Sequence, residues 1–114
     1  MPEPTLFQKI ILREIPAEIL LETEEAIVIK DIHPQAPVHV LIIPKKLIPR
    51  ISESREEDAL LLGKLLLTAK AFAERENLSN GYRLVINNGR MAGETVPHLH
   101  IHLFAGRHMT WPPC

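Results

Sequence analysis

This chain of 114 residues lacks several features that are typical of secreted and membrane proteins. The one cysteine, Cys114, cannot form an internal disulfide, which favours a reducing compartment such as the cytoplasm. No apolar run approaches the roughly 18 residues that a membrane-spanning helix needs. Residues 1–4 lack the basic and apolar parts of a signal peptide. We therefore expect a cytoplasmic protein with no membrane partner.

An excess of positive charge is also missing. Thirteen Lys and Arg residues stand against fourteen Asp and Glu residues, which gives a formal net charge of −1. A protein that binds nucleic-acid polymers through a basic face needs a clear positive excess, so we expect no such partner. The length suits a single domain over residues 1–114, and 46% hydrophobic with 24% charged residues is an ordinary globular composition.

The periodicity of apolar residues predicts a fold of the α+β class. A short helix is indicated over residues 5–12, with Thr5 as its N-cap. A long helix is indicated over residues 55–76, opened by a capping box of Ser54 and Glu57. β-branched and aliphatic runs predict five strands, at residues 19–21, 26–29, 38–43, 82–87 and 98–104. The order of these elements predicts an antiparallel sheet with its helices on one face.

The long helix has two apolar faces. One face holds Leu62, Leu65, Leu66, Ala69, Phe72 and Ala73. Leu60, Leu67 and Ala71 lie on nearly the opposite side. A monomer needs only one of these faces for its core, and an exposed apolar stripe favours aggregation. This pattern predicts a homodimer.

Three histidines alternate with apolar residues in the last predicted strand. Successive side chains of a strand point to opposite faces, so His98, His100 and His102 would form a row on one face. Three interpretations are open: a merely polar face, an all-histidine metal site, or a site where a neutral imidazole attacks a phosphate. The last also uses the loop just upstream, which carries Gly89, Gly93 and the hydroxyl of Thr95.

The same segment carries a family resemblance. Residues 98–104, His-Leu-His-Ile-His-Leu-Phe, match the His-φ-His-φ-His-φ-φ signature of the histidine triad (HIT) superfamily. Further matches to its nucleotide-binding Hint branch are Asp31-Ile32-His33-Pro34-Gln35-Ala36-Pro37-Val38-His39, Ile43-Pro44-Lys45-Lys46, Gly81-Tyr82-Arg83, Gly106-Arg107 and Trp111-Pro112-Pro113. The chain thus resembles a single HIT domain over nearly its whole length.

This resemblance implies a fold and an activity. It implies a homodimer whose sheet extends across both subunits, and a hydrolase that splits the P–N bond of adenosine 5'-monophosphoramidates through a nucleotidyl-histidine intermediate. The ligand would be a purine nucleoside monophosphate or phosphoramidate, with no cofactor and no metal. The alternatives are a non-catalytic nucleotide-binding or scaffold protein and a dinucleoside polyphosphate hydrolase.

The resemblance also implies a role for individual residues. His100 would be the nucleophile, His98 and His102 would bind or protonate around the phosphate, and His39 would support them. Thr95 would contact the phosphate, and Asp31 would bind the ribose hydroxyls. The remaining nucleotide-binding residues would be Leu6, Phe7, Ile10, Ile29, Ile32 and Leu41 around the base, Asn87 and Gly93 near the phosphate, and Trp111 reaching toward the partner's site.

Plainer interpretations compete at several of these positions. Asp31 could form an Asx turn, and His39 could be a buried, satisfied histidine. Five apolar residues of the base pocket could be ordinary core, namely Leu6, Phe7, Ile10, Ile29 and Leu41. His33 and His108 are expected at the surface. Three residues depart from the family's pattern, namely Glu94, Pro97 and Cys114. A charge at position 94 would either weaken the binding of an anionic substrate or point to solvent.

Overall fold

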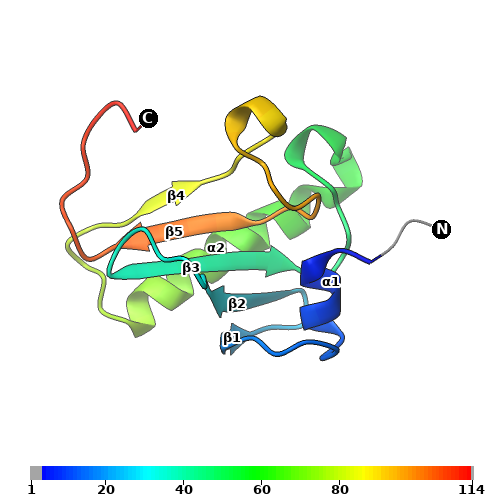
Figure 1. Cartoon of the computed structure of the whole chain (residues 1–114), viewed down its shortest axis with the longest axis horizontal. Coiled ribbons are helices and arrows are strands. Elements are labelled where there is room, and N and C mark those ends of the chain that lie inside the picture. The colour runs from blue at the N-terminus through cyan, green and yellow to red at the C-terminus, as the bar shows by residue number, and fades with distance from the viewer. Residues whose placement is uncertain (1–3, 114) are drawn as a thin grey trace.

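The computed structural model describes residues 4–113, so Cys114 and residues 1–3 lie outside the described part. The chain forms one five-stranded antiparallel sheet, as the sequence predicts, and its strand order is β1-β2-β3-β5-β4 (Figure 1). Its strands are β1 Ile19–Glu22, β2 Ala26–Lys30, β3 Val38–Pro44, β4 Arg83–Val85 and β5 Ile101–Ala105. Its helices are α1 Leu6–Ile11, α2 Ala59–Arg75 and the 3₁₀ turns η1 Ile51–Glu53, η2 Glu56–Asp58 and η3 Arg90–Ala92.

The two α-helices lie on opposite faces of the sheet, so the expectation that both would share one face is wrong (Figure 1). On one face Val28, Val40 and Ile42 pack with α2 residues such as Phe72. On the other face Ile27, Ile29, Leu41 and Ile43 pack with Phe7 and Ile10 of α1. Strands β2 and β3 are apolar at nearly every position, and a strand of that kind must be covered on both sides.

Helix α2 begins four residues later than its sequence pattern predicts. Ser54 does not cap it, because the Ser54 hydroxyl donates to the carbonyl of Ile51 at 2.6 Å. Residues 56–58 instead form η2, where the Asp58 carboxylate accepts from the backbone N–H of Arg55 at 2.9 Å. The Asp58 carboxylate also pairs with Lys46 at 2.6 Å, an interaction between distant residues that local spacing does not reveal.

Helix α2 has the two apolar faces that its sequence predicts, with one exception. Leu65, Ala69, Phe72 and Ala73 are buried against the sheet, whereas Leu66, assigned to the same face, is 51% exposed. Leu60 and Leu67 are 72% and 63% exposed, so the second apolar face is present and uncovered in this single chain.

Two strands are shorter than predicted. Strand β4 pairs only with β5, from Arg83 opposite Phe104 to Val85 opposite His102. Strand β5 begins at Ile101 rather than at residue 98, because its pairing with β3 ends there. Just before it, the backbone N–H of Leu99 donates to the carbonyl of Ile48 at 2.7 Å, in the segment that follows β3.

None of the helices in residues 4–113 is both long and apolar enough to cross a membrane.

Candidate active site

The histidine row keeps its predicted face although only its last member lies in a regular strand. Leu99, Ile101 and Leu103 are buried in the core beneath α2. On the opposite side the rings of His100 and His102 lie 5.1 Å apart. Phe7 of α1 meets His100 edge-on at 5.0 Å and His98 at 6.0 Å. The short helix therefore packs directly on the row.

A cavity of about 600 Å³ opens between α1, the ends of the strands and the histidine row. Ten residues that the sequence analysis assigned to the site line it, namely Leu6, Phe7, Ile10, Ile29, Asp31, Ile32, Leu41, Thr95, His100 and His102. Phe7, Ile10, Ile29 and Leu41 also belong to the core cluster on this face. At these positions the core and pocket interpretations hold together, because the same side chains fill the core and form the cavity wall.

Five other assigned residues do not reach the cavity. His39 and His98 lie buried behind the wall. Asn87 and Gly93 lie beside each other, since a Cβ on Gly93 would be 3.8 Å from the Asn87 amide nitrogen. Trp111 is 82% exposed and does not line the cavity.

The cavity wall also includes residues that the sequence analysis missed. They are Ile15, Pro16, Ala17, Glu18, Lys30, Pro34 and Val96. Lys30, Pro34 and Val96 adjoin assigned residues, so their neighbours were an available signal. Residues 15–18 link α1 to β1 and form part of no recognisable motif.

The geometry leaves one nitrogen of His100 available for chemistry. Its Nδ1 lies 2.7 Å from the carbonyl oxygen of His98, and a carbonyl can only accept, so the proton is on Nδ1. The lone pair is then on Nε2, for which residues 4–113 supply no hydrogen-bond partner. His100 lines the cavity although it is only 8% exposed. A ligand in the cavity would meet an unprotonated imidazole nitrogen.

His102 presents the opposite group to the cavity. The backbone N–H of Gln35 donates to His39 Nδ1 at 3.0 Å, which places the His39 proton on Nε2. That Nε2 donates to His102 Nδ1 at 2.9 Å, so His102 carries its own proton on Nε2. Burial, assisted by the positive charges that His100 and His39 can carry, lowers the pKa of His102 to about 4. His102 is therefore a neutral N–H donor at neutral pH.

His98 has a structural role, because it links three segments of the chain by hydrogen bonds. It is 0% exposed, its Nε2 donates to the carbonyl of Pro44 at 2.8 Å, and its Nδ1 accepts from the hydroxyl of Thr5 at 3.1 Å. The Thr5 hydroxyl in turn accepts from the backbone N–H of Gln8 and caps α1. Burial also lowers the pKa of His98. With both nitrogens occupied, His98 has no group left for the phosphate contact that the resemblance implies.

Asp31 forms an Asx turn and also lines the cavity, and His39 is a buried histidine that is bonded to the histidine row. One Asp31 oxygen accepts from the backbone N–H of His33 at 2.8 Å, which is an Asx turn, and the side chain still lines the cavity. The other oxygen lies 3.4 Å from His39 Nε2. His39 is buried with both nitrogens bonded, and burial lowers its pKa against the opposing charge of Asp31.

Asp31, His39 and His102 form the one group in the described chain with the composition of a metal site. Their candidate ligand atoms all lie within 4.8 Å of one another. The hydrogen bond between His39 and His102 already occupies two of these atoms. A cation bound there would have to break that bond and remove the proton that fixes the His102 tautomer.

Glu94 does not point to solvent, because its side chain is only 10% exposed and is paired with Arg50. The guanidinium of Arg50 holds its carboxylate by Nε at 2.9 Å and Nη2 at 3.0 Å. The backbone N–H of Gly89 donates to the same carboxylate at 2.9 Å. These hydrogen bonds hold the pKa of Glu94 below its usual value.

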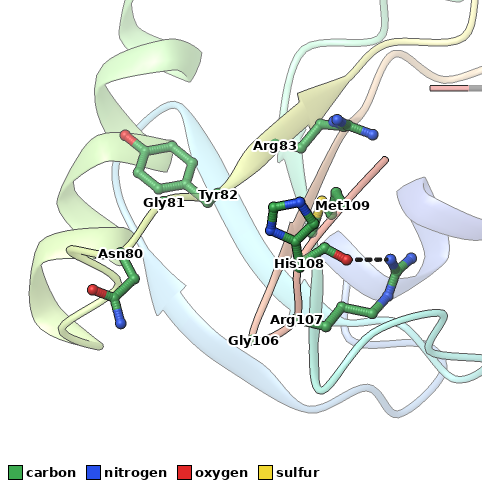
Figure 2. Close-up of a pocket in the computed structure, with 8 residues that line it drawn as sticks. All are labelled: Asn80, Gly81, Tyr82, Arg83, Gly106, Arg107, His108 and Met109. Atoms are coloured by element: carbon green, nitrogen blue, oxygen red, sulfur yellow. Dashed lines mark hydrogen bonds between the residues drawn. The ribbon is translucent and has the colours of Figure 1, made fainter. Parts of the chain in front are cut away.

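A second cavity, of about 500 Å³, lacks comparable chemistry. Figure 2 shows its walls, residues 80–83 and 106–109, which include the family-like segments Gly81-Tyr82-Arg83 and Gly106-Arg107. Arg83 donates to the carbonyl of Thr110 at 3.0 Å, and Arg107 donates to the carbonyl of His108 at 3.3 Å. His33 and His108 are exposed, as expected. The histidine row therefore defines the candidate active site.

Comparison with known proteins shows the family of the chain. The family model described as HIT domain matches residues 12–109. A HIT-like protein of Synechococcus elongatus is 54% identical over 113 residues, which is 99% of each chain. A protein of Arabidopsis thaliana named adenylylsulfatase HINT1 is 45% identical, over 96% of this chain and 76% of its own length.

A solved structure shows the same fold. The crystal structure of a HIT family hydrolase from Legionella pneumophila superposes with a TM-score of 0.95 at 47% identity, over 97% of this chain and 100% of that one. The match of the family model over most of the chain, the similarity of the relatives and the superposition agree with one another. The chain belongs to the HIT family.

Proposed function

We propose that the protein is a hydrolase that splits the P–N bond of purine nucleoside 5'-phosphoramidates. The observation that carries this proposal is the unprotonated Nε2 of His100 at the wall of the 600 Å³ cavity. A neutral imidazole nitrogen is an effective nucleophile near neutral pH, and a covalent intermediate divides a difficult hydrolysis into two easier steps.

The proposed reaction follows from the two tautomers. His100 Nε2 bonds to the phosphorus as the P–N bond to the leaving group breaks, and the departing amine takes its proton from solvent, because the neutral ring of His102 donates a hydrogen bond without releasing its Nε2 proton. His102 Nε2–H is the donor that lines the cavity, so we assign it to a phosphate oxygen or the leaving nitrogen. Water then cleaves the bond between phosphorus and His100, which releases the nucleoside monophosphate and restores the enzyme.

The rest of the cavity suits a nucleoside. Its apolar side chains, Phe7, Ile10, Ile29 and Leu41, would stack on a purine, and Asp31 would accept hydrogen bonds from the ribose. Thr95 would donate its hydroxyl to the phosphate. Asn87 and Gly93 would support the loop that carries Thr95 and would not touch the ligand.

The cavity also bears on the alternative of a dinucleoside polyphosphate hydrolase. Polyphosphate chains carry several negative charges and are bound by clustered Lys and Arg side chains. Of the described residues that line the cavity, Lys30 is the only cation. A monophosphate with an amine leaving group therefore fits this site better than a polyphosphate.

We further propose that two copies of the chain form a cytoplasmic homodimer. The uncovered face of α2 with Leu60 and Leu67 supplies an apolar surface, and β4 is one of the two edge strands at which a sheet could continue. In such a dimer the exposed Trp111 would be available to the partner's cavity, as the resemblance implies.

The function is tested by turnover and binding together. Release of amine and AMP is measured from an adenosine phosphoramidate after dialysis against EDTA, in parallel with diadenosine polyphosphates and adenylyl sulfate. We expect the phosphoramidate to be the best substrate and the activity to survive dialysis. AMP binding without turnover would instead show a nucleotide-binding protein, and activity that returned only with stoichiometric zinc would contradict metal independence.

A further inference from the structure

An ion pair joins two segments that are far apart in the chain and both lie beside the candidate active site. Arg50 approaches Glu94 with Nε and Nη2, a two-pronged contact whose distances are 2.9 and 3.0 Å. The Glu94 side chain is only 10% exposed and that of Arg50 29% exposed. Bidentate guanidinium–carboxylate pairs with this degree of burial fix orientation as well as distance.

The same carboxylate closes the loop on which it lies. Gly89 N–H donates to Glu94 Oε1 at 2.9 Å, and Glu94 N–H donates to the Gly89 carbonyl at 3.2 Å. A second tie joins the same two segments, since Ser52 N–H donates to Asn88 Oδ1 at 2.9 Å. Residues 88–94 are therefore held as one compact turn against residues 50–52.

The residues that follow this turn belong to the cavity. Thr95 and Val96 line it, directly after Glu94 in the chain. The segment that carries Arg50 also supplies the carbonyls of Pro44 and Ile48, which accept hydrogen bonds from His98 and Leu99. One segment thus anchors both the histidine row and the loop with Thr95.

We propose that Arg50 and Glu94 act as a clamp that positions the Thr95 hydroxyl against the phosphate end of the cavity. Both are positioning residues, because neither lines the cavity and each acts through Thr95. The inference rests on the proposed function. The guanidinium also neutralises an acidic side chain next to an anionic substrate, so breaking the pair would both loosen the loop and expose a repelling charge.

The first test separates turnover from binding. Glu94→Gln keeps an acceptor for Gly89 N–H but removes the charged, two-pronged contact with Arg50. A misplaced catalytic contact costs up to about 100-fold in rate, so we expect kcat for the phosphoramidate to fall at least 10-fold. The KM and the affinity for AMP should change less than about threefold, since the base pocket is untouched. Equal losses in kcat and kcat/KM would then mark a contact made in the transition state.

The second test asks whether the clamp acts through Thr95. In a double-mutant cycle, Glu94→Gln should add little to the loss already caused by Thr95→Ala. Lys46→Met is the matched control, because it breaks the Lys46–Asp58 ion pair on the same segment without touching the loop. We expect its kcat to match that of the wild type.

Amide hydrogen exchange is measured without substrate, so it tests the clamp independently of the proposed function. Amide hydrogen exchange followed by mass spectrometry should show faster exchange over residues 88–96 in Glu94→Gln and unchanged exchange in Lys46→Met. If the wild type released no amine, the proposed function would fail while the exchange data still decided whether the clamp orders the loop. Unchanged exchange and kcat in Glu94→Gln, or full additivity with Thr95→Ala, would overturn the clamp.

Discussion

Three chemically identical side chains in one row have different roles because their nitrogens meet different partners. His98 is bonded at both nitrogens by Thr5 and Pro44, His102 is bonded at Nδ1 by His39, and His100 keeps Nε2 free. The alternation of the motif predicts the shared face, and the structure confirms it. It cannot separate the roles, because several deciding partners lie outside the motif: the hydroxyl of Thr5, 93 residues away, the carbonyl of Pro44 and the ring of His39.

The buried histidines predict how stability depends on pH. The pKa of His102 is lowered to about 4 in the folded chain, whereas an unfolded histidine titrates near 6.5. Between these values the unfolded chain binds a proton that the folded chain does not, so the free energy of unfolding decreases as the pH falls from about 6.5 toward 4. His39 and His98 add in the same direction, since burial lowers the pKa of each. Thermal unfolding at pH 7.5, 5.5 and 4.5 measures this decline.

A matched variant isolates the contribution of His102 to that decline. His102→Asn keeps an acceptor near the position of Nδ1 for the proton of His39 but cannot titrate. We expect its melting temperature to fall less than that of the wild type between pH 6.5 and 4.5. Parallel curves for the two proteins would contradict the lowered pKa of His102.

At the scale of elements, helix α1 is joined to the site through one hydroxyl. Thr5 caps the helix and donates to His98, so Thr5→Val removes both hydrogen bonds without changing the shape of the side chain much. Loss of an N-cap costs about 1 kcal/mol, and an unpaired buried nitrogen on His98 adds to it. We expect the free energy of unfolding to fall by about 1–2 kcal/mol in urea titrations. AMP affinity should fall too, because Leu6, Phe7 and Ile10 line the cavity from this helix.

Thr5→Ser is the control for this variant. It retains the hydroxyl, so its stability and AMP affinity should stay close to those of the wild type. A Thr5→Val protein as stable as the wild type would show that the cap and the His98 contact contribute nothing.

Local patterns locate most elements and fail where distant residues intervene. Helix α1 and strands β1 to β3 lie within a residue or two of their predicted positions, because capping and apolar periodicity are local properties. The start of α2 is displaced, since Asp58 is drawn to Lys46 and Arg55 instead of joining the helix. The start of β5 is displaced as well, since the Ile48 carbonyl takes the hydrogen bond of Leu99.

At the scale of the whole molecule, the candidate active site and the edge strand β4 lie in different regions. The cavity is built where α1 covers the end of the sheet, from residues spread between positions 6 and 102. Family-like motifs locate most of the wall, but residues 15–18 enter it only through the path of the chain after α1. Edge strand β4 and the exposed face of α2 remain for another partner.

The uncovered face of α2 predicts the oligomeric state. Sedimentation equilibrium at micromolar concentration should give a mass near twice the 12.9 kDa of one chain. Leu67→Glu places a charge in the apolar face and should shift the protein toward the monomer. A wild-type mass near that of one chain would contradict the proposed dimer.

The proposed reaction depends on a covalent bond between His100 and the nucleotide, which mass spectrometry can detect. The wild-type reaction with an adenosine phosphoramidate is quenched in alkali, which preserves phosphoramidate bonds, and the digested protein is examined by mass spectrometry. The account predicts a nucleotidylated peptide modified at His100, absent from a His100→Ala variant that still binds AMP. Modification at His98 or His102, or undiminished turnover by His100→Ala, would contradict it.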